Sequence, residues 1–180
     1  LVKESQDQDI FTPSDLDEEQ QMIVQATNDF LDNEVMPNRD RIEVQEEGVT
    51  TTLLEQAGEL GLLGLAVPEE FGGLGKDFNT NSLIVETMAR ARSFTLSWGA
   101  HVGIGTLPIV YFGNQEQKEK YLPGLASGQL KASYCLTEPS SGSDALGAKT
   151  RADLSEDGKN YVLNSKKMWI TNAGFADIFT

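Results

Sequence analysis

The stretch from Tyr134 to Asp144, YCLTEPSSGSD, constrains the fold of this chain more than any other segment. It begins as a short apolar strand and breaks into a turn full of hydroxyls. Residues before it recur at helical spacing, whereas residues after it are typical of strands and hairpins. A strand that ends in Thr, Pro, Gly and serines places side-chain oxygens and free backbone N–H groups at one end of a sheet, a usual position for a polar cofactor. Most serine-rich turns are only turns, so composition alone leaves both interpretations open.

Helical patterns fill the chain up to about residue 123. Asp17 and Gln20 form a capping-box pattern before apolar residues at helical spacing, and Pro37 is expected to stop this helix. Four further helices are expected: over 52–60, capped by Thr52 with Glu55 and closed by Gly61; over 80–92; from about Thr95 onward; and from the caps Asn114 and Gln117 to Pro123.

Strands are expected after Gly128. Residues 132–137 alternate between apolar and polar side chains, which predicts a half-buried strand. Two more strands, 148–154 and 160–164, are joined through Asp157-Gly158, a favoured hairpin turn. Residues 169–171 are expected to form another extended segment. The β-prone residues 178–180 are expected to belong to a strand that the sequence interrupts. The fold class expected is α+β, with a helical domain over 1–131 and the beginning of an antiparallel β-domain over 132–180.

The charge balance excludes some partners. There are 28 acidic and 14 basic residues, and the net charge of -14 argues against binding to a nucleic-acid backbone or to anionic lipid. No apolar run approaches the ~20 residues that span a bilayer, so no transmembrane segment is expected. The first residues resemble neither a signal peptide nor an Arg-rich transit sequence, although a presequence could already have been removed.

Two residues occur once each. Cys135 excludes an intrachain disulfide, fits a reducing compartment, and is expected to be a small apolar strand residue. His101 lies in a segment that completes no Ser-His-Asp, Cys-His or metal-ligand set, so a structural histidine is expected. No metal site is expected.

Two segments carry a resemblance to a known family. They are LTEPSSGSDA over 136–145 and MWITN over 168–172, and they are flanked by VPEEFGG over 67–73, FGNQEQKEKYLPGLASG over 112–128 and ADIFT over 176–180. Together they resemble the acyl-CoA dehydrogenase family, in the family's order from about Phe11 onward. The residues around Ser140-Ser141 and over 176–180 are similar to its very-long-chain branch.

The resemblance implies an FAD site. Thr137 would hydrogen-bond the polar edge of the isoalloxazine, and the Thr171 hydroxyl would reach N5. Trp169 would cover the flavin face away from the substrate. Gly142 and Ser143 would approach the phosphates, with Ser143 also contacting the acyl-CoA substrate. The full set of cofactor-binding residues implied is Tyr134, Cys135, Leu136, Thr137, Gly142, Ser143, Trp169, Ile170 and Thr171.

The reaction implied is α,β-dehydrogenation of a long-chain acyl-CoA in fatty-acid β-oxidation, with electrons leaving through an electron-transfer flavoprotein. The family's catalytic base is a glutamate in a C-terminal helical domain absent from this sequence, so no catalytic residue is assigned. Glu138 is expected to make a structural hydrogen bond. A homo-oligomer, dimer or tetramer, is expected, in the cytoplasm or alternatively the mitochondrial matrix. Two other interpretations stay open: an acyl-CoA oxidase-like relative and a non-catalytic helical scaffold.

Two details are specific to this chain. Where the family has Asn-Gly before the Lys-x-Trp-Ile-Thr run, this sequence has Asn164-Ser165, so a different turn type is expected. Gly99, Ala100 and Gly103 give one helical stretch an unusual density of small residues, which close helix packing would also explain. We expect them to deepen a tunnel for a long acyl chain.

Overall fold

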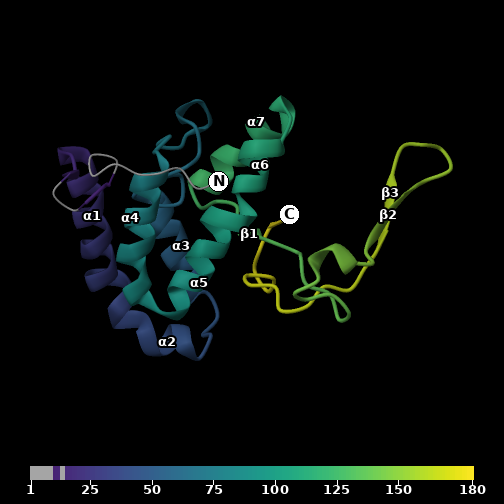
Figure 1. Ribbon diagram of the computed structural model, residues 1–180. Coiled ribbons are helices and arrows are strands. Elements are labelled where there is room, and N and C mark those ends of the chain that lie inside the picture. The colour runs from purple at the N-terminus through teal and green to yellow at the C-terminus, as the bar shows by residue number, and fades with distance from the viewer. Residues whose placement is uncertain (1–9, 13–14) are drawn as a thin grey trace.

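The computed structural model describes residues 10–12 and 15–180. Its helices gather into one body, and the chain after β1 leaves this body and runs out to a hairpin (Figure 1). The α+β class is confirmed, with 53% of the residues helical. The elements in chain order are α1 (Glu18–Phe30), the π-helix η3 (Leu31–Val35), the 3₁₀ turn η4 (Met36–Asn38), α2 (Arg39–Glu43), α3 (Val49–Glu59), η5 (Glu69–Phe71), α4 (Phe78–Met88), η6 (Ala89–Ala91), α5 (Ser93–Gly99), the π-helix η7 (Ala100–Gly105), α6 (Leu107–Phe112), α7 (Gln115–Ala126), β1 (Ala132–Ser133), η8 (Ala145–Gly147), β2 (Arg151–Leu154), β3 (Tyr161–Asn164) and β4 (Ile178–Phe179).

Helix α1 begins as its sequence predicts. The Asp17 side chain accepts a hydrogen bond from the Gln20 backbone, and the Gln20 side chain accepts one from the Asp17 backbone, so the capping box is present. The expected stop at Pro37 is wrong, because the helical path continues through η3 and η4 into α2. Pro37 sits in the first turn of η4, where a residue without an N–H breaks no helical hydrogen bond.

Other helix boundaries are partly confirmed. The capping box of Asn114 and Gln117 opens α7, and Gly61 follows α3 with a φ of 77°. Thr52 is not the cap of α3, because Gly48 takes that position with a φ of 83° and the helix starts at Val49. Helix α7 also continues past Pro123 to Ala126.

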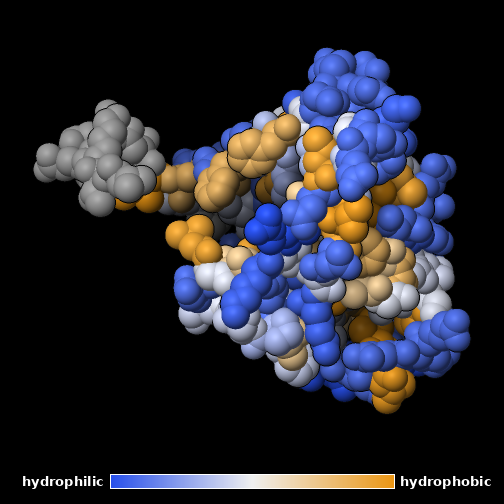
Figure 2. All heavy atoms as spheres, turned by 90° about the vertical axis from the view of Figure 1, so that its right-hand side faces the viewer, coloured by the Kyte–Doolittle hydropathy of each residue, from blue (hydrophilic) through white to orange (hydrophobic). Residues whose placement is uncertain are grey.

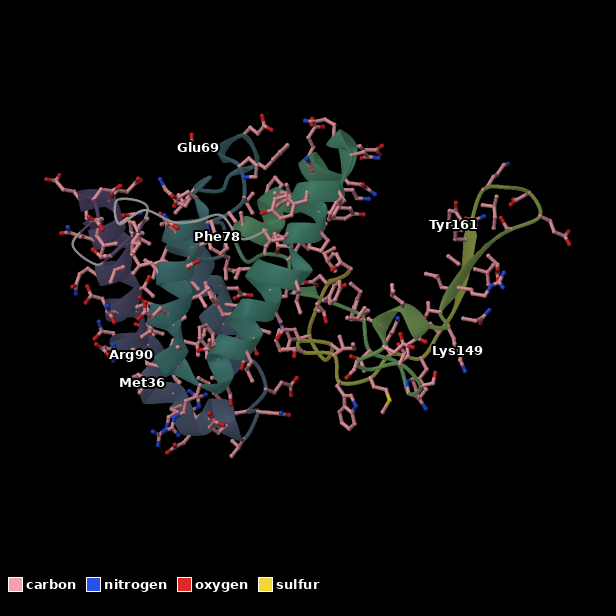
Figure 3. All side chains as sticks on the ribbon, viewed as in Figure 1. Met36, Glu69, Phe78, Arg90, Lys149 and Tyr161 are labelled. Atoms are coloured by element: carbon pink, nitrogen blue, oxygen red, sulfur yellow. The ribbon has the colours of Figure 1, made fainter. Side chains whose placement is uncertain are left out.

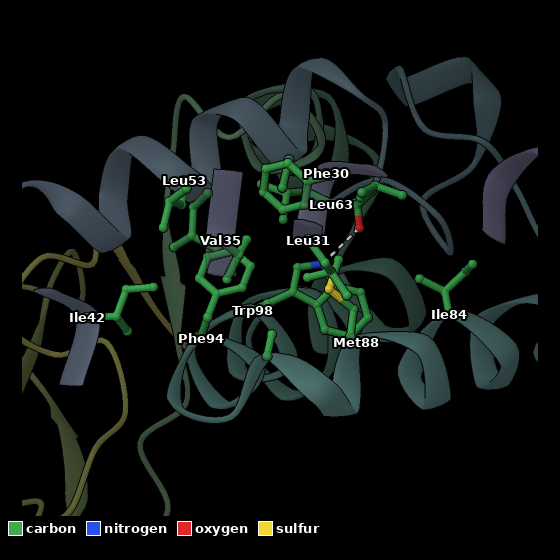
Figure 4. Close-up of a cluster of buried hydrophobic side chains, with 14 of the residues drawn as sticks. Phe30, Leu31, Val35, Ile42, Leu53, Leu63, Ile84, Met88, Phe94 and Trp98 are labelled. Carbon is green, nitrogen blue, oxygen red and sulfur yellow. Dashed lines mark hydrogen bonds between the residues drawn. The ribbon is translucent and has the colours of Figure 1, made fainter. Parts of the chain in front are cut away.

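The larger of two apolar clusters joins the first helices. It forms around the fully buried side chains of α1, α3, α4 and α5, with Phe30 and Phe94 ring centroids 6.0 Å apart (Figure 4). Trp98 is 1% exposed and donates from Nε1 to the Leu62 carbonyl at 3.1 Å, drawn as a dashed line in Figure 4. The indole is thereby both packed and satisfied, so α5 is anchored firmly to the loop after α3.

The strands form two separate pairs. β2 and β3 make the expected antiparallel hairpin, with Gly158 at a φ of 70° in its turn. β4 lies parallel to β1 in the register Ala132 with Ile178 and Ser133 with Phe179, so residues 178–180 do have a partner. The pairing brings the two ends of segment 134–177 together at the helical body.

Two expected strands are corrected. Only residues 132 and 133 of the expected strand 132–137 belong to β1. The pairing with the C-terminal residues reaches Cys135, and the chain then folds back at Glu138 and Ser141. Residues 169–171 are not extended, since Trp169 has a φ of 58° and the turn that follows includes Thr171. The turn expected at Asn164-Ser165 does not form, because Asn164 ends β3 and Ser165 follows it outside any turn, without a positive φ. None of the described helices combines the length and the apolarity needed to cross a bilayer.

Candidate functional site

The structure brings the two segments of the resemblance together. The Met168 N–H donates to the Thr137 carbonyl at 2.9 Å, and the Lys167 ammonium donates to the Leu136 carbonyl at 3.1 Å. The Ser133 hydroxyl, just before the first segment, donates to the Thr171 carbonyl at 2.7 Å. Residues far apart in sequence therefore present their side chains on one edge of the fold.

Several groups on this edge are free to bind a ligand. Within the described part of the chain, the hydroxyls of Thr137 and Thr171 have no hydrogen-bond partner, and the backbone N–H groups of Gly142 and Ser143 have no acceptor. Thr171, Gly142 and Ser143 are exposed, whereas Thr137 is half-buried. Adjacent free N–H groups suit an anion such as a phosphate, and free hydroxyls suit the polar edge of a planar ring system.

Trp169 stands out on this edge. Its side chain is 84% exposed and its backbone has a φ of 58°, a conformation uncommon for a bulky residue. Hydrophobic atoms also appear among hydrophilic ones on the face that carries this part of the chain (Figure 2). A large indole held in a strained backbone and left open to solvent is a surface suited to an aromatic ligand.

The remaining residues implied by the resemblance lie close by. Tyr134, Cys135 and Ile170 are half-buried, and Leu136 is 39% exposed. The Cys135 N–H donates to the Thr180 carbonyl at 2.7 Å, so this residue extends the pairing of β1 with β4. Cys135 thus belongs to the scaffold of the edge, as expected for a small strand-like residue.

Glu138 holds the hydroxyl-rich turn in shape. Its carboxylate is 6% exposed and accepts hydrogen bonds from the backbone N–H groups of Lys149 and Thr150, from the Thr150 hydroxyl and, at 2.8 Å, from the Lys167 ammonium. Lys149 lies where the chain enters the hairpin (Figure 3). The Lys167 ammonium and the other donors lower the pKa of Glu138 to about 2. Such a carboxylate is a structural anchor and a poor proton acceptor.

Comparison with known proteins decides the family. The model of the acyl-CoA dehydrogenase N-terminal domain matches residues 17–129, and that of the middle domain matches residues 133–180. The chain belongs to the acyl-CoA dehydrogenase family. A probable acyl-CoA dehydrogenase of Bacillus subtilis is 55% identical over 179 residues, which cover 99% of this chain and 30% of that protein. The human very long-chain specific acyl-CoA dehydrogenase, a mitochondrial protein, is 44% identical over 93% of this chain and 26% of its own length.

A solved structure agrees with these matches. The crystal structure of an acyl-CoA dehydrogenase complexed with FAD from Bacillus anthracis superimposes with a TM-score of 0.92 at 56% identity, over 94% of this chain and 30% of that one. The chain therefore spans about a third of the length of such relatives. Acyl-CoA dehydrogenases are FAD-dependent oxidoreductases. The free hydroxyls, the free N–H groups and the open indole of segments 134–145 and 168–172 are the donor set that a flavin with its pyrophosphate requires.

A hollow of about 590 Å³ lies beside Thr171, on the edge that carries the candidate site. Thr171 and Asn172 form one side of it, and the end of α2 with the loop that follows forms another, with Glu43, Glu46 and Glu47. Three carboxylates would repel the phosphates of coenzyme A. This hollow is therefore unsuited to the phosphates of coenzyme A.

Sequence reasoning missed the residues that support the edge. Asn172 is 7% exposed, has a φ of 68° and donates to two carbonyls, and Ser133 holds the Thr171 carbonyl. Lys167 pairs with Glu138. Asn172 closes the MWITN segment of the resemblance, and asparagine tolerates a positive φ better than most side chains, but neither signal predicts what its side chain contacts. Its hydrogen bonds depend on contacts between distant segments.

His101 is a structural histidine, as expected. Its ring is fully buried, with Nδ1 accepting from the Ala132 N–H at 3.0 Å and Nε2 at 3.0 Å from the Leu125 carbonyl. Since Nδ1 accepts, the proton lies on Nε2, which donates to Leu125, and the ring is neutral. Burial lowers the pKa of His101 from 6.5 to about 4. The ring thus ties η7 and α7 to β1 and cannot serve as a base near neutral pH.

This burial predicts a loss of stability in acid. Between pH 6.5 and 4 the unfolded chain binds a proton at His101 and the folded chain does not, so stability falls as the pH falls, by on the order of 3 kcal/mol in total. Urea unfolding at several pH values would measure this slope in the full-length protein. His101→Gln, which can accept and donate without titrating, should flatten it. Equal slopes for the two proteins would refute the assignment.

Proposed function

We propose that this chain forms the helical wall and the first flavin-binding part of an FAD-dependent acyl-CoA dehydrogenase that acts on long-chain thioesters in fatty-acid β-oxidation. One observation carries the proposal: the hydrogen bond between Met168 and Thr137 pairs two segments whose free hydroxyls, free N–H groups and exposed indole match the needs of a flavin. The identity to very long-chain relatives supports the substrate class.

Each group has a role in this proposal. The hydroxyls of Thr137 and Thr171 bind the polar edge and N5 of the ring, and Trp169 covers one ring face. Gly142 and Ser143 donate backbone N–H groups to phosphate, with Ser143 also facing the substrate. Tyr134, Cys135, Leu136 and Ile170 complete the cofactor-binding surface. Bound FAD supplies a two-electron acceptor for the hydride that leaves the β-carbon, while a carboxylate outside this sequence takes the α-proton.

The chain-length proposal rests on the face of α5 and η7. A Cβ added at Gly99 or at Gly103 would have no atom within 4 Å, and the neighbouring Leu96 and Ile104 are 69% and 54% exposed. Ala100, by contrast, is 7% exposed and packs inward. Gly99 and Gly103, without Ala100, are therefore the residues we propose to leave room for a long acyl chain.

The remaining parts of the proposal concern the whole protein. We propose a division into a helical domain over 1–131 and a flavin-binding domain from 132, an electron-transfer flavoprotein as electron acceptor, and a homo-oligomer. The Bacillus relatives support a cytoplasmic location, since bacteria lack the mitochondrion of the human relative.

An anaerobic visible spectrum of the full-length protein tests the function. Addition of a long-chain acyl-CoA should bleach the flavin absorbance, because the substrate reduces the bound FAD. A colourless protein, or a yellow one that no acyl-CoA bleaches, would contradict the proposal. Bleaching followed by rapid release of hydrogen peroxide in air would indicate an acyl-CoA oxidase instead of a dehydrogenase.

A further inference from the structure

Asn172 lies where three parts of the fold meet. It follows Thr171 directly, is 7% exposed and has a φ of 68°. Its carbonyl accepts hydrogen bonds from the N–H groups of Phe175 and Ala176 at 3.0 and 2.8 Å, so it closes the turn after segment 168–172. A glycine would satisfy this backbone equally well, which leaves the asparagine side chain to be explained.

The side-chain amide bridges a helix and a strand. Nδ2 donates to the Ser97 carbonyl of α5 at 2.9 Å and to the Ala132 carbonyl of β1 at 3.2 Å. Both partners are acceptors, so the amide can have only this orientation. Oδ1 is then buried, and no other described residue donates to it. The residue keeps an unsatisfied acceptor in the interior, which indicates that the Nδ2 bridge outweighs the penalty.

Thr171 is held both through its neighbour Asn172 and through its own carbonyl. The Ser133 hydroxyl of β1 donates to the Thr171 carbonyl, and the Ala132 N–H is in turn held by His101 of η7. Ala132 therefore has both backbone groups bound by side chains, His101 on the N–H and Asn172 on the carbonyl. Through this arrangement the turn carrying Thr171 is fastened to α5 and η7, the elements that carry Gly99 and Gly103.

We propose that Asn172 is a positioning residue, assisted by Ser133, that fixes the position of the Thr171 hydroxyl relative to α5 and η7. Asn172 and Ser133 thereby fix the flavin edge relative to the acyl chain, although neither residue contacts the flavin or the acyl chain. The inference rests on the proposed function, since it takes the Thr171 hydroxyl to be a flavin contact.

Variants of the full-length protein test this role. Asn172→Gly keeps the positive φ and removes the amide, Ser133→Ala removes one hydrogen bond, and Asn160→Gly makes the same residue change at an exposed hairpin position. FAD affinity of the apoprotein, the visible spectrum of the flavin, kcat and KM, and the melting temperature are measured for each. Asn172→Gly should weaken FAD binding and lower kcat by about tenfold or more, and shift the flavin absorption bands. Ser133→Ala should change all three quantities in the same direction by less, and Asn160→Gly should change none of them.

The outcomes distinguish a positioning role of Asn172 from a purely structural role. A lower melting temperature with unchanged FAD affinity, flavin spectrum and kcat would overturn the inference. If Asn172→Gly fails to fold, Ser133→Ala decides: a shifted flavin spectrum supports positioning, and an unshifted one overturns it.

Thr171→Val separates this inference from the proposed function, with the exposed Thr52→Val as its control. A shifted flavin spectrum in Thr171→Val together with an unchanged Asn172→Gly would overturn the positioning role alone. No shift in Thr171→Val would remove the flavin contact on which both depend.

Discussion

Replacement of Trp98 by alanine is expected to lower the free energy of unfolding by about 3–5 kcal/mol. The indole is 1% exposed and lies in the cluster formed by α1, α3, α4 and α5 (Figure 4). Alanine would leave a cavity that close-packed neighbours such as Leu62 and Met88 can fill only in part. Urea unfolding of the purified full-length variant, compared with the parent at one temperature, measures the change.

Trp98→Phe is the matched control. Phenylalanine keeps most of the apolar volume and loses the donor to the Leu62 carbonyl, so we expect a smaller cost of about 1–3 kcal/mol. A cost below about 1 kcal/mol for Trp98→Ala would mean that the helices do not pack around this side chain as described.

Replacement of Gly103 by leucine is expected to change the chain-length profile. The new side chain would enter the open space beside η7 and displace about four methylene groups of a bound acyl chain, at about 0.8 kcal/mol each. The kcat/KM for a 16-carbon acyl-CoA should fall by roughly 100-fold. Steady-state rates over a series of acyl-CoA lengths measure the profile.

Butyryl-CoA is the internal control for this variant. A four-carbon chain ends before the filled space, so its kcat/KM should stay within about twofold of the parent value, at roughly 0.4 kcal/mol or less. An unchanged profile would refute the tunnel. Equal losses at all lengths would also refute it, because they would indicate general damage. Ala100→Glu is a poorer test, since Ala100 is buried and the carboxylate would disturb packing.

Features set by neighbouring residues were predictable. The capping boxes at Asp17 and Asn114 and the hairpin at Asp157-Gly158 appear as the sequence indicates. Each depends on side chains within a few residues of one another, so no distant contact is needed to specify it. The resemblance added the positions of segments 136–145 and 168–172, which physical patterns alone left open.

Features set by distant contacts were missed. The expected strand 132–137 does not reach Thr137, because beyond Cys135 the chain enters a turn that Glu138 holds by accepting from Lys149, Thr150 and Lys167. Trp169 takes a positive φ where the local residues favour an extended chain. Thr52 resembles a helix cap, yet Gly48 takes that place. In the first two cases the tertiary environment overrides the local preference, and both lie in the candidate site itself, whereas the start of α3 is set by Gly48, four residues before Thr52.

The pairing of β1 with β4 has a consequence for the order of folding. Lys131 and Asp177 are 46 residues apart, and every contact between the two strands must close this loop at an entropic cost that grows with its length. The helices rely mostly on local hydrogen bonds and can form first. Pulsed hydrogen exchange during refolding should therefore protect amides of α3 and α4 before those of Cys135 and Thr180. A polypeptide emerging from the ribosome would then present a finished helical surface before the edge that we propose to bind the flavin is assembled on it.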